Sequence, residues 1–284
     1  MRPTLAFPAE DAAVSQALAG TAEIAASRER VRSRLLGRER AVTFLLAGGF
    51  LVSACLCALL VPSDTSFSLS TTLLLVLVYA VVSQIEFEVG PGSAVPTELV
   101  LVPMLFVLPP GDVPLAVAAG LVAGGLTERL RSKRHGERVP VLLCSAWHSV
   151  GPALVFGLLA PGPPAASRAP LYLVALLAQF ALDSMSVFVR HRLGRGVPVR
   201  ALFPALVWVV TVDLMLAPLA LVVAVPAVEQ PVAVLAVLPL AGLLHVLGVD
   251  RRRRIDESLV LGRAVADASR AARSDPLTGG NRLA

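Results

Sequence analysis

Eight long apolar segments constrain this chain more than any other feature of its sequence. They cover approximately residues 41–61, 68–85, 95–108, 113–126, 139–160, 170–189, 201–225 and 231–249. A helix crosses a bilayer in about 20 residues, with a working range of roughly 17–25, and six of the eight segments fall in that range. Only 16% of the 284 residues are charged, too few to cover a soluble domain. The sequence therefore predicts an all-α integral membrane protein with about eight transmembrane segments.

The third and fourth segments are the exceptions. Each has about 14 residues, and prolines interrupt or flank them at Pro96, Pro103, Pro109, Pro110 and Pro114. Helices this short do not comfortably cross the hydrocarbon core. The alternative to eight spans is therefore six spans plus a re-entrant hairpin at 95–126, which dips into the membrane from the cytoplasm and returns.

Lysine and arginine predict the orientation of the chain. With a cytoplasmic N-terminus, the inside segments hold 24 of the 25 basic residues, and only Arg168 lies outside. Cytoplasmic loops are enriched in Lys and Arg, so both termini are predicted to be cytoplasmic in either topology. Clustered arginines beside apolar segments suit anionic lipid headgroups. We therefore expect the lipid bilayer as a partner and no nucleic acid.

Polar segments flank the predicted membrane domain, residues 41–249. Residues 1–40 are predicted to be a cytoplasmic helical segment rather than a cleavable signal peptide, because the first apolar run begins only at Ala41. Residues 250–273 open with four arginines and then continue a helical apolar pattern without proline. They predict a cytoplasmic helix whose small, Ala-rich positions can pair with a second copy, although a solitary solvated helix fits the pattern equally well.

The polar residues 274–284 carry a family resemblance. The residues concerned are Asp275, Leu277, Thr278, Gly279, Asn281 and Arg282. This run resembles the Asp-x-Leu-Thr-Gly-Leu-x-Asn-Arg opening of the GGDEF family, although two residues rather than three separate Thr278 from Asn281. GGDEF domains are bacterial diguanylate cyclases, which condense two GTP into cyclic di-GMP. In that family the opening follows a cytoplasmic signalling helix.

The resemblance implies the N-terminal membrane sensory region of such a cyclase, in a bacterial cytoplasmic membrane, truncated just after the opening of its catalytic domain. In that family the opening is a structural turn, so the resemblance assigns no catalytic residue to this chain. GTP and magnesium would belong to the missing cyclase domain, and the chain itself implies no cofactor. Dimerisation through 250–273 is also implied, because the family needs two GTP-loaded domains that face each other.

Ionisable groups at membrane depth are costly, so each one suggests a functional hypothesis. The candidate intramembrane polar site comprises Glu98, His148, Gln179, Asp183 and Asp213. His148 and Asp213 are predicted at similar depth, where they can form a titratable Asp–His pair or simply a packing hydrogen bond. Gln179, Asp183 and Ser186 lie at i, i+4 and i+7, so they predict a polar stripe on one helix face.

The remaining chemistry-bearing residues predict no further site. Cys55, Cys57 and Cys144 lie within apolar segments, and we expect them to pack as small apolar side chains rather than to bind a metal. No phosphate-binding loop, nucleophile elbow or paired-His helix is present in the sequence. The sequence thus shows no catalytic residue in this chain, and it leaves enzyme activity undecided: the protein is a diguanylate cyclase only if a full GGDEF domain follows.

These observations support two functions. The first is a membrane-embedded sensory and anchoring module that relays a membrane or small-molecule signal to a cytoplasmic diguanylate cyclase domain. The alternative is a small-solute or ion transporter that uses the intramembrane acidic residues for coupling. A truncated product with no function of its own is a third possibility, which the sequence leaves open.

Overall fold

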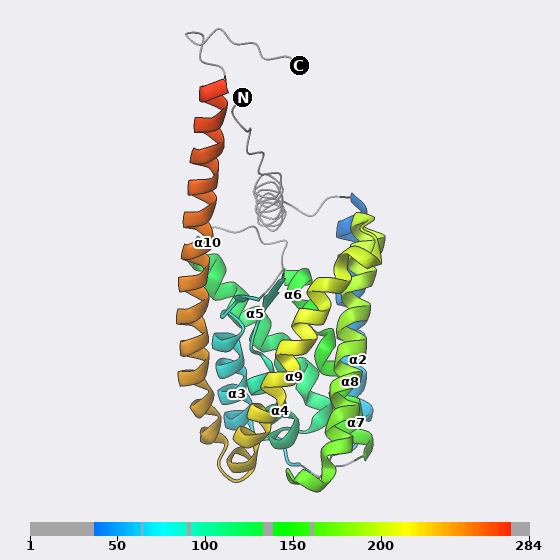
Figure 1. The fold of residues 1–284 in the computed structure, drawn as a ribbon. Helices are drawn as coiled ribbons and strands as arrows, with labels where there is room; N and C mark the ends of the chain where they lie inside the picture. Colours follow the sequence, from blue (N-terminus) through cyan, green and yellow to red (C-terminus); the bar gives the residue numbers. More distant parts are fainter. Residues whose placement is uncertain (1–36, 64, 90–91, 133–138, 160–161, 274–284) are drawn as a thin grey trace. The chain divides into compact units, whose positions relative to one another are not determined.

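The computed structural model describes residues 37–63, 65–89, 92–132, 139–159 and 162–273 (Figure 1). By its contacts the chain divides into two units, residues 34–248 and residues 1–33 with 249–284. The elements in chain order are α2 (Gly37–Leu60), α3 (Leu69–Val82), β1 (Phe87–Val89), β2 (Gly92–Ala94), α4 (Glu98–Val107), η1 (Pro110–Asp112), α5 (Val113–Ser132), α6 (Val139–Ser145), η3 (Ala146–Ser149), α7 (Val150–Leu159), η4 (Ala166–Arg168), α8 (Ala169–Val189), η5 (Arg190–Gly194), α9 (Val199–Glu229), η6 (Pro231–Ala236) and α10 (Val237–Arg273).

All eight apolar segments form helices, as the sequence predicts. Six stretches of the described residues are long and apolar enough to cross a membrane, namely Gly37–Leu60, Pro110–Thr127, Val139–Leu159, Ala166–Gly194, Leu202–Glu229 and Pro231–Arg254. The protein is therefore a multi-pass, helical membrane protein by length and composition. The only strands among the described residues are the short antiparallel pair β1–β2, in which Phe87 pairs with Ala94.

The segment 95–126, for which the sequence leaves open either two spans or a re-entrant hairpin, forms a short helix and a long one joined by η1. Its first half is short, because α4 has 10 residues, but α5 has 20. The turn η1 packs against the end of α2: a Cβ added at Gly111 would lie 2.5 Å from the carbonyl oxygen of Cys57. Pro110 and Pro114 lie at helix starts, where proline removes no hydrogen bond.

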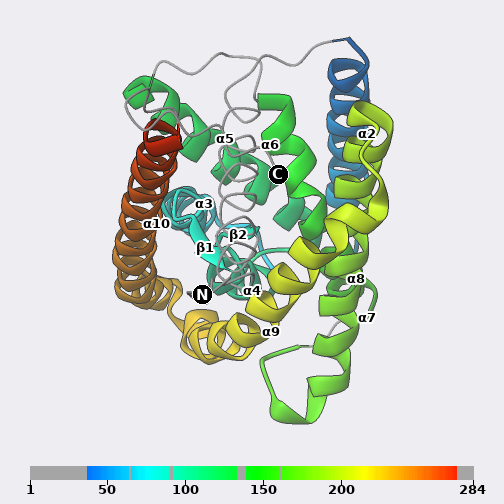
Figure 2. The same ribbon diagram turned by 45° about the horizontal axis from the view of Figure 1, so that its top comes forward.

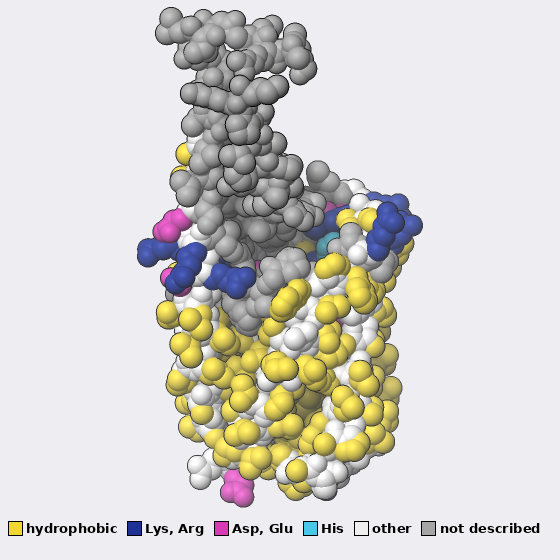
Figure 3. Space-filling view, in the orientation of Figure 1, with side chains coloured by type: hydrophobic (Ala, Val, Ile, Leu, Met, Phe, Trp, Pro, Cys, Tyr) yellow, Lys and Arg dark blue, Asp and Glu magenta, His cyan; other side chains and the backbone are white. Residues whose placement is uncertain are grey.

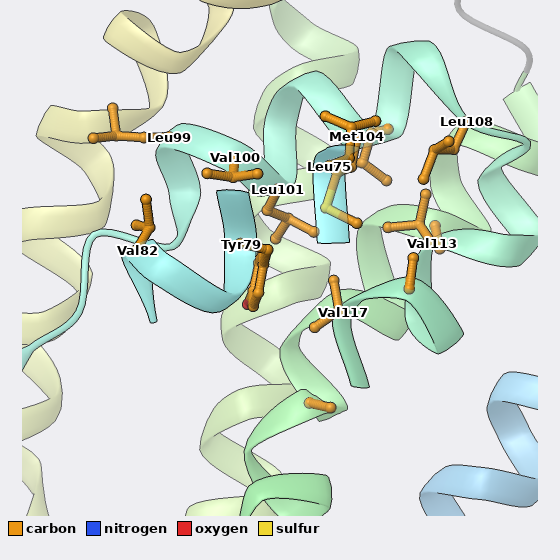
Figure 4. Packing of buried hydrophobic residues seen from close by; sticks show 14 of the residues in the cluster. Leu75, Tyr79, Val82, Leu99, Val100, Leu101, Met104, Leu108, Val113 and Val117 are labelled. Carbon is orange, nitrogen blue, oxygen red and sulfur yellow. The ribbon is translucent and has the colours of Figure 1, made fainter. Parts of the chain in front are cut away.

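The short helix α4 lies inside the bundle rather than against lipid. It contacts α3, α5, α7 and α9, which surround it in Figure 2. Leu99, Val100, Leu101 and Met104 are fully buried, and Figure 4 shows them among side chains of α3 and α5, including Leu75. A helix that is apolar on every side belongs in a core. The length of α4 therefore need not match the thickness of the hydrocarbon core of the bilayer.

The surface of the 34–248 unit is apolar, as a membrane-embedded surface must be. Figure 3 shows hydrophobic side chains over most of the face in view. Large exposed apolar residues include Leu45 and Leu59 on α2, Leu173 on α8, and Met215 and Val222 on α9. A contiguous apolar surface of this kind is rare on soluble monomers.

One end of this unit is fastened by a contact between the start of α2 and η5. The guanidinium of Arg195 lies 2.6 Å from the Glu39 carboxylate, and its Nε donates to the same oxygen at 2.7 Å. Gly194 allows the approach, because a Cβ there would lie 3.3 Å from Glu39 Cα. The two segments are more than 150 residues apart in sequence.

The polar segments of the chain are described only in part. The predicted helix at 250–273 is confirmed as the second part of α10. The predicted N-terminal helical segment, apart from its last residues 37–40 in α2, lies outside the described residues. The run from Asp275 to Arg282 lies outside them as well.

Candidate functional site

Glu98 and Gln179 form the centre of the candidate site. Glu98 is the first residue of α4 and is only 2% exposed. Its Oε1 accepts a hydrogen bond of 2.5 Å from Nε2 of Gln179, which lies on α8 and is 4% exposed. The position at a helix N-terminus favours an acidic side chain, because the backbone N–H groups there have no helical partner.

The second carboxyl oxygen of Glu98 has no partner. Oε2 is buried and makes no hydrogen bond to any of the described residues. Burying an unsatisfied polar group costs about 1–3 kcal/mol in proteins. Most buried polar atoms in native structures are satisfied, so an orphan of this kind calls for an explanation.

Two further carboxyl groups lie near Glu98. Asp183 follows Gln179 by one turn of α8, and Asp213 lies on α9 with 9% of its surface exposed. Both lie close enough to Glu98 to interact with it electrostatically. Neither makes a hydrogen bond or ion pair within the described part of the chain. Three carboxyl groups therefore gather within an otherwise apolar bundle.

The predicted pairing of His148 with Asp213 is not formed. Nδ1 of His148 lies 2.6 Å from the carbonyl oxygen of Ser145 and must donate to it. Nε2 of the neutral ring is then an acceptor, and it receives the hydroxyl of Tyr79 at 3.1 Å. The carboxyl group that interacts electrostatically with His148 is that of Asp183. A tyrosine inside an apolar run carries no pattern that predicts this role.

The predicted stripe on α8 is confirmed as a bundle-facing surface. Gln179 and Ser186 are buried, and Asp183 is half-buried. The hydroxyl of Ser186 donates to the carbonyl oxygen of Cys144 at 2.8 Å. The stripe therefore ties α8 to α4 at one end and to α6 at the other.

The cysteines behave as packing residues. Cys57 and Cys144 are buried and Cys55 is exposed, and all three are free thiols. The thiol of Cys144 donates to the carbonyl oxygen of Thr43 at 3.3 Å. Among the residues that the structure describes, no group of three or more His, Cys, Asp or Glu side chains is arranged to hold a metal ion.

A cavity of about 210 Å³ adjoins Glu98 and Gln179. Its walls come from α4, α7, α8 and α9, and these two residues are the polar groups of its lining apart from Tyr172. The other lining side chains are aliphatic or aromatic, among them Val102, Phe156 and Leu176. A mostly apolar cavity with a few convergent polar groups is the usual form of a small-molecule site.

Comparison with known proteins adds no assignment: no family model, curated protein or solved structure matches the chain. The site must therefore be interpreted from its own geometry. In the structure Glu98 and Gln179 are in contact, and Asp183 and Asp213 lie near Glu98. His148 is hydrogen-bonded to Tyr79 instead. The site thus contains a buried carboxyl oxygen without a hydrogen-bond partner, and an apolar cavity lies beside the Glu98–Gln179 pair.

Proposed function

We propose that this protein is the membrane-embedded sensory and anchoring module of a cyclic di-GMP signalling protein. The observation that carries the proposal is α10, which extends from Val237 to Arg273 as a single helix of 37 residues. Its first part is apolar and belongs to a candidate span, and its second part carries four consecutive arginines and then a polar, Ala-rich sequence. A helix shared by a membrane bundle and a polar region can transmit a rearrangement of the bundle.

The buried polar cluster supplies the other half of the proposal. Glu98, Asp183 and Asp213 lie inside an otherwise apolar bundle, where retaining such groups is costly. A signal acts by binding one bundle arrangement more tightly than another. The orphaned oxygen of Glu98 offers a contact that a bound molecule would satisfy in one arrangement only.

The proposal also includes cytoplasmic termini and diguanylate cyclase activity as the output. The distribution of Lys and Arg favours cytoplasmic termini. The resemblance of residues 275–282 to the opening of a GGDEF domain favours diguanylate cyclase as the output, with two copies pairing through 250–273. In that arrangement GTP and magnesium act in the cyclase domain, not in the bundle.

The test changes the rotation of the second part of α10 relative to the first. We would join a diguanylate cyclase domain after residue 284 and insert residues between Val260 and Leu261 of α10. Two residues rotate the following part of a helix by roughly 200°, whereas seven rotate it by only about −20°. Relay through α10 predicts that the two-residue insertion changes cyclic di-GMP levels severalfold, while the seven-residue insertion, the matched control, preserves them. Equal output from both insertions at equal membrane abundance would refute the relay.

The three neighbouring carboxyl groups also favour a second function, a proton-coupled or ion-coupled transporter. Proton relays in transporters use acidic side chains at membrane depth. Purified protein in liposomes, loaded with a pH-sensitive dye, measures proton flux directly. Flux that is abolished by Asp213→Asn would support transport, and its absence together with phase-dependent cyclase output would support the sensor.

A further inference from the structure

The cavity beside the Glu98–Gln179 pair opens on the apolar outer surface of the bundle. Among its lining residues, Leu173 of α8 is 52% exposed and Leu214 of α9 is 46% exposed. Figure 3 shows the surface hollowed in this area, between the helices that Figure 1 labels α8 and α9. In a membrane protein such a surface borders the acyl chains of the bilayer, where there is no water. The mouth of the cavity is therefore in contact with hydrocarbon.

The lining of the cavity offers too few free polar groups to hold water. Among the described residues that line it, only Glu98, Gln179 and Tyr172 have polar side chains. Oε1 of Glu98 accepts from Gln179, and Oε2 is fully buried in this arrangement of the helices, so it offers no contact to a molecule in the cavity. The hydroxyl of Tyr172 accepts from the backbone N–H of Ala165. An ordered water needs about two to four polar partners, so this lining favours a hydrocarbon occupant.

The cavity is long for its volume. Along α8 its lining extends from Ala169 to Gln179, which corresponds to about 15 Å of helix. A dry apolar cavity of about 150 Å³ accepts benzene, which has six heavy atoms, so 210 Å³ accommodates in proportion about eight heavy atoms. These dimensions fit the end of a linear chain better than a fused ring system. Because α8 belongs to a candidate span, the long direction of the cavity also roughly follows the direction of acyl chains in a bilayer.

The inner wall of the cavity belongs to α4, the helix that lies inside the bundle. Val102 and Leu105 of α4 line the cavity, and Leu105 is only 5% exposed. On the same helix Leu101 is fully buried and does not line the cavity. A lipid chain therefore touches Leu105 only by entering the cavity, and it does not reach Leu101 even then.

We propose that this cavity binds the end of one phospholipid acyl chain, which enters between α8 and α9 and packs against α4. The chain supplies the van der Waals contacts that the lining of an empty cavity would lack. The inference names the membrane component that the proposed sensor detects, and it rests on that function only for the consequence of binding. Binding itself is measurable on the full chain without any output domain.

Photo-crosslinking lipids test the occupancy. The full chain would be placed in nanodiscs of phosphatidylcholine that carries a diazirine either at the end of an acyl chain or next to the glycerol, and mass spectrometry would map the labelled residues. We expect the chain-end probe to label Leu105 severalfold more than Leu101, one turn away on α4, and the glycerol-end probe to label neither. Equal labelling of Leu101 and Leu105 would overturn the proposal. So would an unlabelled Leu105, the result expected if a free apolar molecule filled the cavity instead.

Variants at the mouth locate the entry of the chain. Ala217→Phe of α9 places a large side chain in the cavity and should abolish labelling of Leu105. Leu219→Phe, on the same helix but outside the lining, is the matched control and should leave it unchanged. Leu177 on the outer face of α8 is 57% exposed and does not line the cavity, so its labelling reports ordinary contact with the bilayer and should be equal in all three proteins. Labelling of Leu105 that persists in Ala217→Phe would refute the location.

The outcomes separate this inference from the proposed function. If Leu105 is labelled as expected but both insertions in α10 give equal cyclic di-GMP output, the lipid site stands and the sensory function fails. If output depends on the phase of α10 but Leu105 is not labelled, the sensor stands and an acyl chain is the wrong ligand.

Discussion

The contact between α7 and α8 predicts a measurable effect of one methyl group at Gly151. Gly151 lies in the first turn of α7, and a Cβ there would lie 2.5 Å from both the carbonyl carbon and oxygen of Ala178. It would also lie 3.0 Å from the backbone nitrogen of Gln179. These neighbours are backbone atoms in the middle of α8, so they cannot rotate away as a side chain would.

The magnitude follows from this geometry. Ordinary van der Waals contact begins at 3.4 Å, so Gly151→Ala must push α7 from α8 by about 0.9 Å, the difference between 3.4 and 2.5 Å. Overpacking of this kind typically costs about 1–3 kcal/mol. Because Gln179 directly follows Ala178 and its backbone nitrogen also lies within 3.0 Å of the added Cβ, its hydrogen bond to Glu98 should weaken as well.

Gly48→Ala in α2 is the matched control. It makes the same substitution in a helix, but no atom lies within 4 Å of the added Cβ. The gain in helix propensity, about 1 kcal/mol for Gly to Ala, is common to both variants and cancels in their difference. The free energies of unfolding in mixed micelles, followed by circular dichroism, should therefore differ by about 1–3 kcal/mol. A Gly151→Ala protein as stable as Gly48→Ala would refute the described contact of α7 with α8.

Three further predictions concern hydrogen bonds and charge. Ser186→Ala removes the hydrogen bond to α6 and should lower the free energy of unfolding by about 0.6 kcal/mol, and by no more than about 1.7 kcal/mol. Ser184→Ala is the control: it breaks no hydrogen bond of the described residues and should be neutral in the same assay. Tyr79→Phe should cost about 0.5–1.5 kcal/mol and shift the nitrogen NMR signal of His148 Nε2, and an unchanged signal would contradict the bond. Glu39→Gln breaks the ion pair to Arg195, the residue after η5, and both side chains of this pair are only partly exposed. We expect the free energy of unfolding to fall by less than about 1 kcal/mol and the loss to shrink in high salt; a loss independent of salt would contradict its ionic origin.

Local patterns in the sequence account for much of what the structure shows. The apolar segments predict the helices, because a stretch of apolar residues must satisfy its backbone hydrogen bonds internally in lipid. The stripe on α8 is predictable as well, because residues at i, i+4 and i+7 share a helix face whatever surrounds the helix. Gln179 and Ser186 are accordingly buried on one side of α8.

Contacts between distant segments were decided only by the tertiary structure. Gln179 and Glu98 are 81 residues apart, and Tyr79 and His148 are 69 apart. The position of a residue along a transmembrane helix predicts its depth in the membrane. By this rule His148 and Asp213 are predicted to lie at similar depth. Which helices adjoin at that level depends on how their surfaces pack, and in this structure the neighbour of His148 is Tyr79 of α3. The helices of this protein thus follow from its apolar segments, while the partners of its buried polar groups follow from packing, which no local pattern encodes.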